Sequence, residues 1–384
     1  MQGPICWNHR RYVAGLARLT SLTIYLKQGI ELKMARRRQS VTIKHVAADA
    51  GVSLQTVSRV INNEANVRPE MKERVQASID KLGYVPSIAA QRMSGSRSYL
   101  ILALNDRERT IEDWRAREGN DWIDQMLLGG MLKCAEYGYR LIFELVDTHS
   151  DHVERELKAA IAALQPDGVI LTPPHGENTL ITGLLDKHKI PYVNIGARQN
   201  GGLSITMGDD RLARKATQYL IDKGHKRIGF IAGSEEYVLS QWRKDGWLEA
   251  MAEHGLETEG LCERGDFSFA SGDKAARNLL GRRNRPTAII AGNDQMAMAT
   301  NKVAHELGLK VPGDLSIISF DNNPVVRFTQ PPLTAIDQPV AETVSRAVEL
   351  LIKAQRGEEL PPMPVVVDGS LVERESVAAP PKSA

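Results

Sequence analysis

The chain carries, at residues 41–62, the stretch VTIKHVAADAGVSLQTVSRVIN. Apolar residues recur at helical spacing on both sides of Gly51, and a glycine permits a tight turn because it tolerates left-handed backbone angles. Thr42 and Ser53 stand where a side-chain oxygen can cap the start of a helix. The stretch therefore predicts a helix-turn-helix whose second helix covers residues 54–62.

A third helix is predicted to begin at Pro69, a residue tolerated at the first helical position, and to end before Gly83. In the second helix, glutamine can pair bidentately with adenine and arginine with guanine, while serine and asparagine can bond to phosphates. The residues predicted to contact DNA from this part of the chain are Thr42, Ser53, Leu54, Gln55, Thr56, Ser58, Arg59 and Asn62. A three-helix bundle with an incidentally polar face is the alternative. The coincidence of caps, turn glycine and basic charge favours DNA binding.

Charge is distributed unevenly along the chain. The net charge of the whole is +2, but residues 1–33 carry +4 and residues 34–98 carry +6, which leaves −8 for residues 99–384. A basic head on an acidic body indicates a polyanionic partner for the head alone.

The cysteines and the apolar pattern indicate a cytoplasmic protein. The three cysteines stand far apart and form no CxxC, which argues against a disulfide framework or a zinc site. No run approaches the ~18 apolar residues of a membrane helix, and residues 12–26 do not resemble a signal peptide. Met34 heads a segment that resembles a natural start. We therefore expect residues 1–40 to be a disordered or mis-called extension, with an extra helix as the alternative.

From Tyr99 onward, apolar strand candidates alternate with amphipathic helix candidates. Strands are predicted at 99–104, 140–146, 168–172, 191–195, 227–232, 287–291 and 315–320. Helices are predicted, among others, at 121–137, 151–164, 209–223, 241–254, 269–281 and 293–307. Repeated strand–helix units imply parallel sheets covered on both faces, and about 280 residues exceed one sheet. The predicted fold is an all-α helix-turn-helix head and hinge over residues 41–98, followed by an α/β sensor of two doubly wound lobes over residues 99–384.

The sensor lacks the GxSxG, Walker, GxGxxG and HExxH motifs, so we predict no catalytic residue, no cofactor and no metal ligand. Doubly wound lobes bind ligands beyond the carboxyl ends of their strands, which directs attention to the loops there. Three such loops lead to Arg243, Asn293 and Asp321, which could clamp the vicinal hydroxyls of a sugar. Alternatively, Asn293 and Asp294 only cap a helix, and Arg243 only pairs with an acid on a solvated face.

The head closely resembles the LacI family of bacterial repressors. The resemblance is carried by AADAGVSLQTVSRVINN at 47–63, RV at 74–75 and LGYVP at 82–86, and it runs from about Val41 almost to the C-terminus. It implies that Leu54, Gln55 and Arg59 read base edges.

The resemblance also implies that residues 87–94 form a hinge helix in the minor groove, with DNA contacts from Ala90 and Met93. Met93 takes the place of the leucine that the family wedges between base pairs. Ser87 departs from the family's asparagine there, and ordinary packing is the alternative for Met93.

For the sensor, the resemblance implies a periplasmic-binding-protein-like fold with an effector between its lobes. Its predicted effector-binding residues are Asp106, Trp122, Arg243, Phe267, Asn293 and Asp321. The first lobe departs from the family pattern, because Asn120-Asp-Trp122 lacks the expected proline and residues 105–119 are longer and more charged than expected. Trp122 could equally belong to the core.

Together these observations predict a cytoplasmic homodimeric repressor of a carbohydrate-utilisation operon. Two heads would bind a palindromic operator, and a small-molecule effector would change the lobe angle and lower DNA affinity. A sugar is the expected effector, with xylose or another pentose as a first guess; whether it releases or promotes DNA binding stays open. A periplasmic solute-binding protein and an enzyme with a regulatory head are the alternatives. The basic head opposes the first, and the missing catalytic motifs oppose the second.

Overall fold

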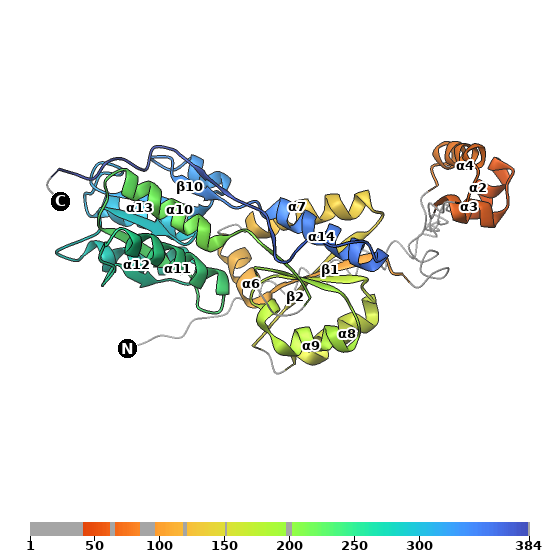
Figure 1. Ribbon diagram of the computed structural model, residues 1–384, viewed down its shortest axis with the longest axis horizontal. Coiled ribbons are helices and arrows are strands. Elements are labelled where there is room, and N and C mark those ends of the chain that lie inside the picture. The colour runs from red at the N-terminus through yellow and green to blue at the C-terminus, as the bar shows by residue number, and fades with distance from the viewer. Residues whose placement is uncertain are drawn as a thin grey trace, which may run out of the picture. The chain divides into compact units, whose positions relative to one another are not determined.

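The structure, a computed structural model, describes residues 41–61, 66–84, 97–117, 121–149, 152–196 and 202–382. By their contacts the described residues form two compact units, one within residues 41–84 and the other within residues 97–382 (Figure 1). The first unit contains the predicted head and the second contains the predicted lobes.

The head consists of α2 (Ile43–Ala50), α3 (Leu54–Ile61) and α4 (Pro69–Leu82). Gly51 has a φ of 63° and ends α2, as the turn requires. The Ser53 Oγ accepts the backbone N–H of Thr56 at 3.1 Å and so caps α3. Val46, Val57 and Val75, one from each helix, are fully buried where the three helices meet. The predicted helix-turn-helix is confirmed.

Two sheets form the second unit. The described strands of the first sheet run in the order β11-β5-β4-β3-β1-β2, with β1 Leu100–Asp106, β2 Arg140–Val146, β3 Gly168–Leu171, β4 Tyr192–Ile195, β5 Leu203–Thr206 and β11 Val365–Val366. Those of the second run in the order β12-β10-β9-β8-β6-β7, with β6 Ile228–Ala232, β7 Cys262–Arg264, β8 Ala288–Ala291, β9 Ser316–Asp321, β10 Thr334–Asp337 and β12 Ser370–Val372. Neighbouring strands are parallel, except that β12 is antiparallel to β10. The predicted pair of doubly wound lobes is confirmed.

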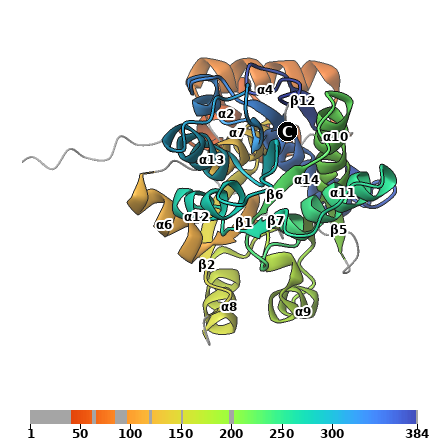
Figure 2. The same cartoon turned by 90° about the vertical axis from the view of Figure 1, so that its left-hand side faces the viewer.

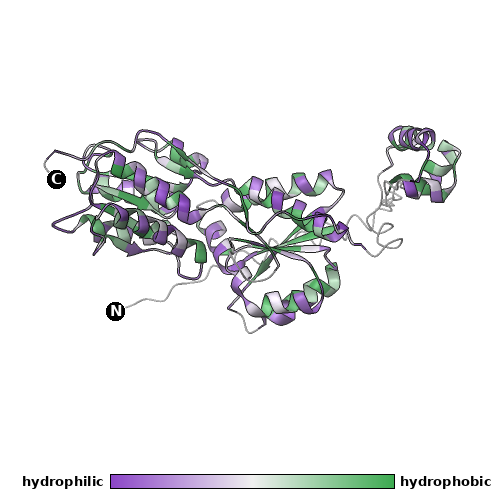
Figure 3. Ribbon diagram, in the orientation of Figure 1, coloured by the Kyte–Doolittle hydropathy of each residue, from purple (hydrophilic) through white to green (hydrophobic). Residues whose placement is uncertain are grey.

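Helices cover both faces of each sheet. In the first lobe, α7 (Asp121–Glu136) and α14 (Val340–Arg356) pack on one face, and α8 (Val153–Leu164) and α9 (Thr179–Lys187) lie on the other (Figures 1 and 2). In the second lobe, α10 (Asp209–Asp222) pairs with α11 (Val238–Glu253), and α12 (Phe269–Leu280) pairs with α13 (Asp294–Glu306). Apolar residues gather on the strands and on the inner sides of these helices (Figure 3). Short 3₁₀ turns occur at His175–Glu177 and Pro324–Arg327.

The lobes are not contiguous in the sequence. The chain passes from the first sheet to α10 after Thr206, returns to the first lobe with α14 after Asp337, and reaches the second sheet again with β12 after Val366. Consequently, each lobe needs C-terminal residues to complete its sheet.

The seven predicted strands and the six named helices are present, with bounds shifted by at most three residues. The prediction did not include β5, β7, β10, β11 and β12, nor α6 (Arg107–Ala116), α9 and α14. The missed strands have two to four residues. β7, β11 and β12 have only two or three residues, too few for a recognisable apolar run. β5 and β10 have four residues each, as the predicted β3, β4 and β8 do, but two of the four are polar.

Candidate functional site

A cavity of about 170 Å³ lies at the carboxyl ends of strands from both sheets. Asp106 is the last residue of β1 and Asp321 the last of β9, so the two lobes contribute opposite walls. All six residues predicted to bind an effector line this one cavity: Asp106, Trp122, Arg243, Phe267, Asn293 and Asp321. The topology therefore brings together residues that are far apart in the sequence.

Arg243, on α11, is held by three hydrogen bonds. Its Nε donates to Oδ1 of Asp209 at 2.8 Å, its Nη2 to Oε1 of Gln338 at 2.8 Å, and its Nη1 to the Gly292 carbonyl oxygen at 2.5 Å. Only 5% of the residue is exposed, and its Cζ lies 4.6 Å from the centre of the Phe320 ring. These contacts fix the guanidinium in one orientation.

The Arg243 guanidinium still presents donors to the cavity. Each Nη nitrogen carries two hydrogens, and the described acceptors use one on each. Oδ1 of Asp321, which also lines the cavity, lies 3.8 Å from Nη1. The expected alternative of an ion pair on a solvated face is wrong, because Asp209 is fully buried. A fixed fork of donors beside a carboxylate suits adjacent hydroxyl groups.

The cavity is rich in carboxylates. Burial raises the pKa of Asp321 to about 6 although Arg243 opposes the shift, and the charges of Asp209 and Asp121 add to it. Burial also raises the pKa of Asp121, on the first-lobe wall. Strand register sets Asp321 beside Asp337 on β10. An anionic ligand would meet repulsion here, whereas hydroxyl groups would find acceptors.

Asn293 caps a helix and lines the cavity at the same time. Its Oδ1 accepts the backbone N–H of Met296 at 2.9 Å, and its Nδ2 donates to the Phe267 carbonyl oxygen at 2.8 Å. The alternative that Asn293 caps a helix is therefore correct, but it is incomplete because Asn293 also lines the cavity. The same bond positions Phe267, whose ring meets that of Tyr237 edge-on at 5.6 Å.

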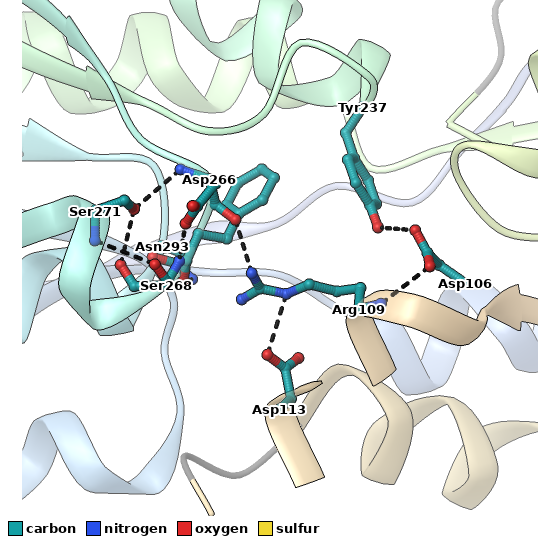
Figure 4. A network of polar contacts seen from close by, with 9 residues as sticks. Asp106, Arg109, Asp113, Tyr237, Asp266, Ser268, Ser271 and Asn293 are labelled. Carbon is teal, nitrogen blue, oxygen red and sulfur yellow. Dashed lines mark hydrogen bonds and ion pairs between the residues drawn. The ribbon is translucent and has the colours of Figure 1, made fainter. Parts of the chain in front are cut away.

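The two first-lobe residues differ in how far they are free to contact a ligand. Trp122, the second residue of α7, is half-buried against the first-lobe core and also lines the cavity, so both interpretations of it hold. The Asp106 carboxylate is already bonded within the protein. Its Oδ1 accepts the Arg109 backbone N–H at 3.1 Å, and its Oδ2 accepts the Tyr237 hydroxyl at 2.7 Å (Figure 4).

Sequence reasoning missed several residues of this cavity. Gln338 follows β10, a strand that the sequence pattern does not predict, so nothing in the sequence marks its loop as a strand end. Arg109 and Asp121 lie in or beside the long charged segment that departs from the family pattern, so the resemblance assigns them no role. Tyr237 lies in the loop after β6, a predicted strand. A single tyrosine in such a loop does not differ in sequence from one that packs in the core.

The head presents the predicted DNA-contacting residues of α3 outward. Leu54 is 45% exposed, and Gln55 and Arg59 are exposed beside it, while Val57 points into the core. The other predicted contacts lie at the start of α2 (Thr42), at the cap and first turn of α3 (Ser53 and Thr56) and half-buried on α3 (Ser58). Asn62, Ala90, Met93 and the predicted hinge helix over residues 87–94 lie outside the described residues.

Comparisons with known proteins agree with both parts. The model of the bacterial regulatory proteins of the lacI family matches residues 42–87, and that of a periplasmic binding protein-like domain matches residues 217–377. The transcriptional regulator CelR of Thermobifida fusca is 32% identical over 348 residues, covering 88% of this chain and 99% of the relative. This chain belongs to the LacI family. The repressor CytR of Escherichia coli is 31% identical over 355 residues, covering 91% of this LacI-family chain and all of the relative.

Solved structures of LacI-family members show the same fold. A complex of the regulator CelR with cellobiose aligns with a TM-score of 0.66 at 31% identity, covering 88% of this chain and 99% of that one. A lac repressor dimer bound to operator and an anti-inducer aligns with a TM-score of 0.71 at 25% identity, covering 89% and 100%. The chain is thus a DNA-binding transcriptional regulator, as the sequence predicted. Within the described residues, no helix has the length and apolar character needed to cross a membrane.

Proposed function

We propose that this LacI-family regulator is a cytoplasmic repressor that binds a palindromic operator as a homodimer and releases it when a sugar enters the cavity. The observation that carries the proposal is the fixed Arg243 fork near the Asp321 carboxylate, with the rings of Trp122 and Phe267 lining the same cavity. Donor, acceptor and aromatic faces are the three features that recognise a polyhydroxylated ring. The relative solved with cellobiose also supports a sugar.

The cavity narrows the choice of sugar. Its volume of about 170 Å³ is below the roughly 300–1,000 Å³ of sites for drug-sized ligands. Its carboxylates disfavour phosphorylated or acidic sugars. A neutral single-ring sugar fits both observations, and xylose or another pentose is the first to test. The regulated genes would then serve carbohydrate utilisation.

Exposed apolar residues support a homodimer. On α7, Leu128, Met131 and Leu132 are 50%, 57% and 61% exposed and follow one another at helical spacing. On the second lobe, Phe328 is 84% exposed next to Val325 at 43%. Clustered apolar side chains of this size mark protein interfaces, and a two-fold dimer buries the same patch of both copies.

The DNA-binding part is tested by substitution on α3. Gln55→Ala and Arg59→Ala should each weaken binding to the specific operator by about 1–3 kcal/mol and leave binding to random DNA almost unchanged. Gln76→Ala, an exposed glutamine on α4, is the matched control and should leave both affinities unchanged. Fluorescence anisotropy on operator and scrambled duplexes gives both numbers. Equal losses on the two duplexes would show that Gln55 and Arg59 contact phosphates.

The ligand is identified by thermal shift with a panel of neutral sugars, sugar phosphates and nucleobases. A true effector at a hundred times its dissociation constant should stabilise the protein by about 2.7 kcal/mol. The proposal expects that stabilisation from a neutral sugar. Stabilisation by a sugar phosphate alone would contradict the expectation that the cavity carboxylates repel phosphorylated sugars.

A further inference from the structure

The helix α6 is fastened to the first lobe. It follows β1 directly, and the Nη2 of Arg107, its first residue, donates to the Leu145 carbonyl oxygen at 2.8 Å and to Oε2 of Glu156 at 2.8 Å. These partners belong to β2 and α8, both in the first lobe. The helix therefore moves with that lobe.

Two hydrogen bonds lead from the start of α6 to the second lobe (Figure 4). Oδ2 of Asp106 accepts the hydroxyl of Tyr237, which directly precedes α11, at 2.7 Å. Nη1 of Arg109 donates to the carbonyl oxygen of Asp266, between β7 and α12, at 2.8 Å. Asp113, one turn further along α6, holds the Arg109 guanidinium with a contact of 3.1 Å to Nε.

The receiving groups on the second lobe are also fixed. The Asp266 backbone N–H donates to Oγ of Ser271 at 3.0 Å, and its Oδ1 accepts the Ser268 N–H at 2.8 Å (Figure 4). The Tyr237 ring packs edge-on against Phe267. Both crossing bonds therefore join groups that are held in place on each side.

We propose that Asp106 and Arg109 are positioning residues that form an interlobe latch across the effector cavity. Because both residues line the cavity, the latch closes at its wall and sets the distance between the two sets of ligand contacts. Every donor and acceptor in the latch belongs to the protein. We call the arrangement of the lobes in this structure closed. The latch stabilises the closed arrangement without a ligand, so less of the effector's binding free energy is needed to close the lobes.

Each carboxylate oxygen of Asp106 accepts one bond from the protein and keeps a second lone pair, so Asp106 can hold the lobes and still contact a ligand in the cavity. A third crossing contact joins Nε2 of His149 to Oε1 of Glu236 at 3.1 Å. More than half of each of those side chains is exposed, so it contributes little compared with the latch. The consequence for effector binding rests on the proposed function, but the latch itself does not.

The test measures lobe separation in the full chain without DNA or sugar. Spin labels at Ala159→Cys on α8 and Lys274→Cys on α12, in a Cys6→Ser, Cys262→Ala background, report the distance between the lobes by double electron–electron resonance. The unsubstituted latch should give one short-distance population. Tyr237→Phe keeps the ring but removes the hydroxyl, and should lower the closed-to-open ratio about tenfold, because a hydrogen bond to a charged group is lost.

Matched controls separate the latch from general destabilisation. Tyr219→Phe removes a hydroxyl that bonds to a carboxylate, Glu373, at 2.7 Å within the second lobe, and should leave the distances unchanged. Arg109→Gln should open the lobes, whereas Arg227→Gln, which loses a bond to the Asn284 carbonyl oxygen within one lobe, should not.

Near-ultraviolet circular dichroism and melting temperature verify that each variant is folded. Distances in Tyr237→Phe and Arg109→Gln equal to those of the parent would overturn the latch, as would a parent that already populates the open arrangement. Equal losses on both duplexes in the α3 experiment, or no stabilising sugar in the thermal-shift panel, would contradict the proposed function and leave the lobe distances untouched, so the two proposals fail independently.

Discussion

At the scale of single residues, the cavity depends on one buried cation among several carboxylates. Arg243 neutralises Asp209, which is fully buried, and lies 3.8 Å from Asp321. Asp294, next to Asn293, is also fully buried, and burial raises its pKa well above the usual range. Carboxylates buried in this way cost stability, and of these three Asp321 lines the cavity and can supply acceptors to a ligand. Such exchanges of stability for function are usual at binding sites.

This exchange gives a pH-dependent prediction for Asp321. Because its pKa is raised to about 6, the folded state binds its proton more tightly than the unfolded state, so the free energy of unfolding falls as the pH rises from about 4 to about 6. Asp321→Asn removes this loss and should stabilise the protein at pH 8 by about 1–2 kcal/mol, after allowance for solvent screening, with no gain at pH 3.5. Asparagine also tolerates the φ of 92° at this position.

Urea unfolding at the two pH values measures the effect. Asp222→Asn, an acid on the surface of α10, serves as the control and should show no such difference. Equal stability of Asp321→Asn and parent at pH 8 would mean that Asp321 is ionised at little cost.

The six effector-binding residues that the sequence predicts do line the cavity, but the sequence does not predict which contacts each of them makes there. Arg243 and Asp321 could be placed because they follow recognisable strands. The partners of Arg243 could not, since Gln338 follows an unpredicted strand and Asp209 comes to it from another helix. Asp106 was placed correctly, but its bond to Tyr237 spans 131 positions and depends on how the lobes meet.

At the scale of elements, a long apolar run was sufficient to predict a strand, and a short edge strand was not predictable. β2 was predicted with its observed bounds, whereas β11 has two residues and β12 three. These edge strands form because the chain returns to each sheet after α14. Their formation therefore depends on tertiary contacts and not on their own sequence. Likewise, α6 has charged residues on most of its surface and no apolar face to reveal it.

The pairing of α7 with α14 gives a prediction at this scale. A Cβ at Gly129 would lie 1.9 Å from the Ala341 carbonyl oxygen, so Gly129→Ala must push the two helices apart and should destabilise the first lobe by about 3 kcal/mol or more. Gly183→Ala, on α9 of the same lobe, meets no atom within 4 Å and should instead stabilise by about 0.5–1 kcal/mol. Chemical denaturation of both variants measures the difference. A tolerated Gly129→Ala would show that α7 and α14 do not pack this closely.

At the scale of the whole molecule, the three passages of the chain between the lobes connect the cavity to both sheets. Residues after Thr206, Asp337 and Val366 link the lobes on the side of the strand ends, where the cavity also lies. A change of lobe angle therefore moves the two cavity walls relative to each other. The two-lobed architecture was predictable from the repeated strand–helix units, but these passages were not, because they join elements that carry no signal of which sheet they enter.

Effector binding in the cavity should be coupled to DNA binding through Asp321. Asp321→Ala removes a cavity acceptor whose side chain is one-third exposed and lies 3.8 Å from Arg243, so it should leave operator affinity without effector unchanged and abolish the effect of the sugar on it. Arg243→Ala is unsuitable for this purpose, because it would leave Asp209 buried without its cation and destabilise the fold. Arg243→Lys keeps the charge but loses the fork, and is the better second variant.

Operator anisotropy with and without the sugar identified by thermal shift measures this coupling, and Asp368→Ala, an exposed carboxylate paired with Arg211, is the control. If the sugar is an inducer, cells carrying Asp321→Ala should keep the operon repressed in its presence. A normal response from both Asp321→Ala and Arg243→Lys would place the effector elsewhere, while the DNA-binding assignment of α3 would stand, because that assignment depends on other residues.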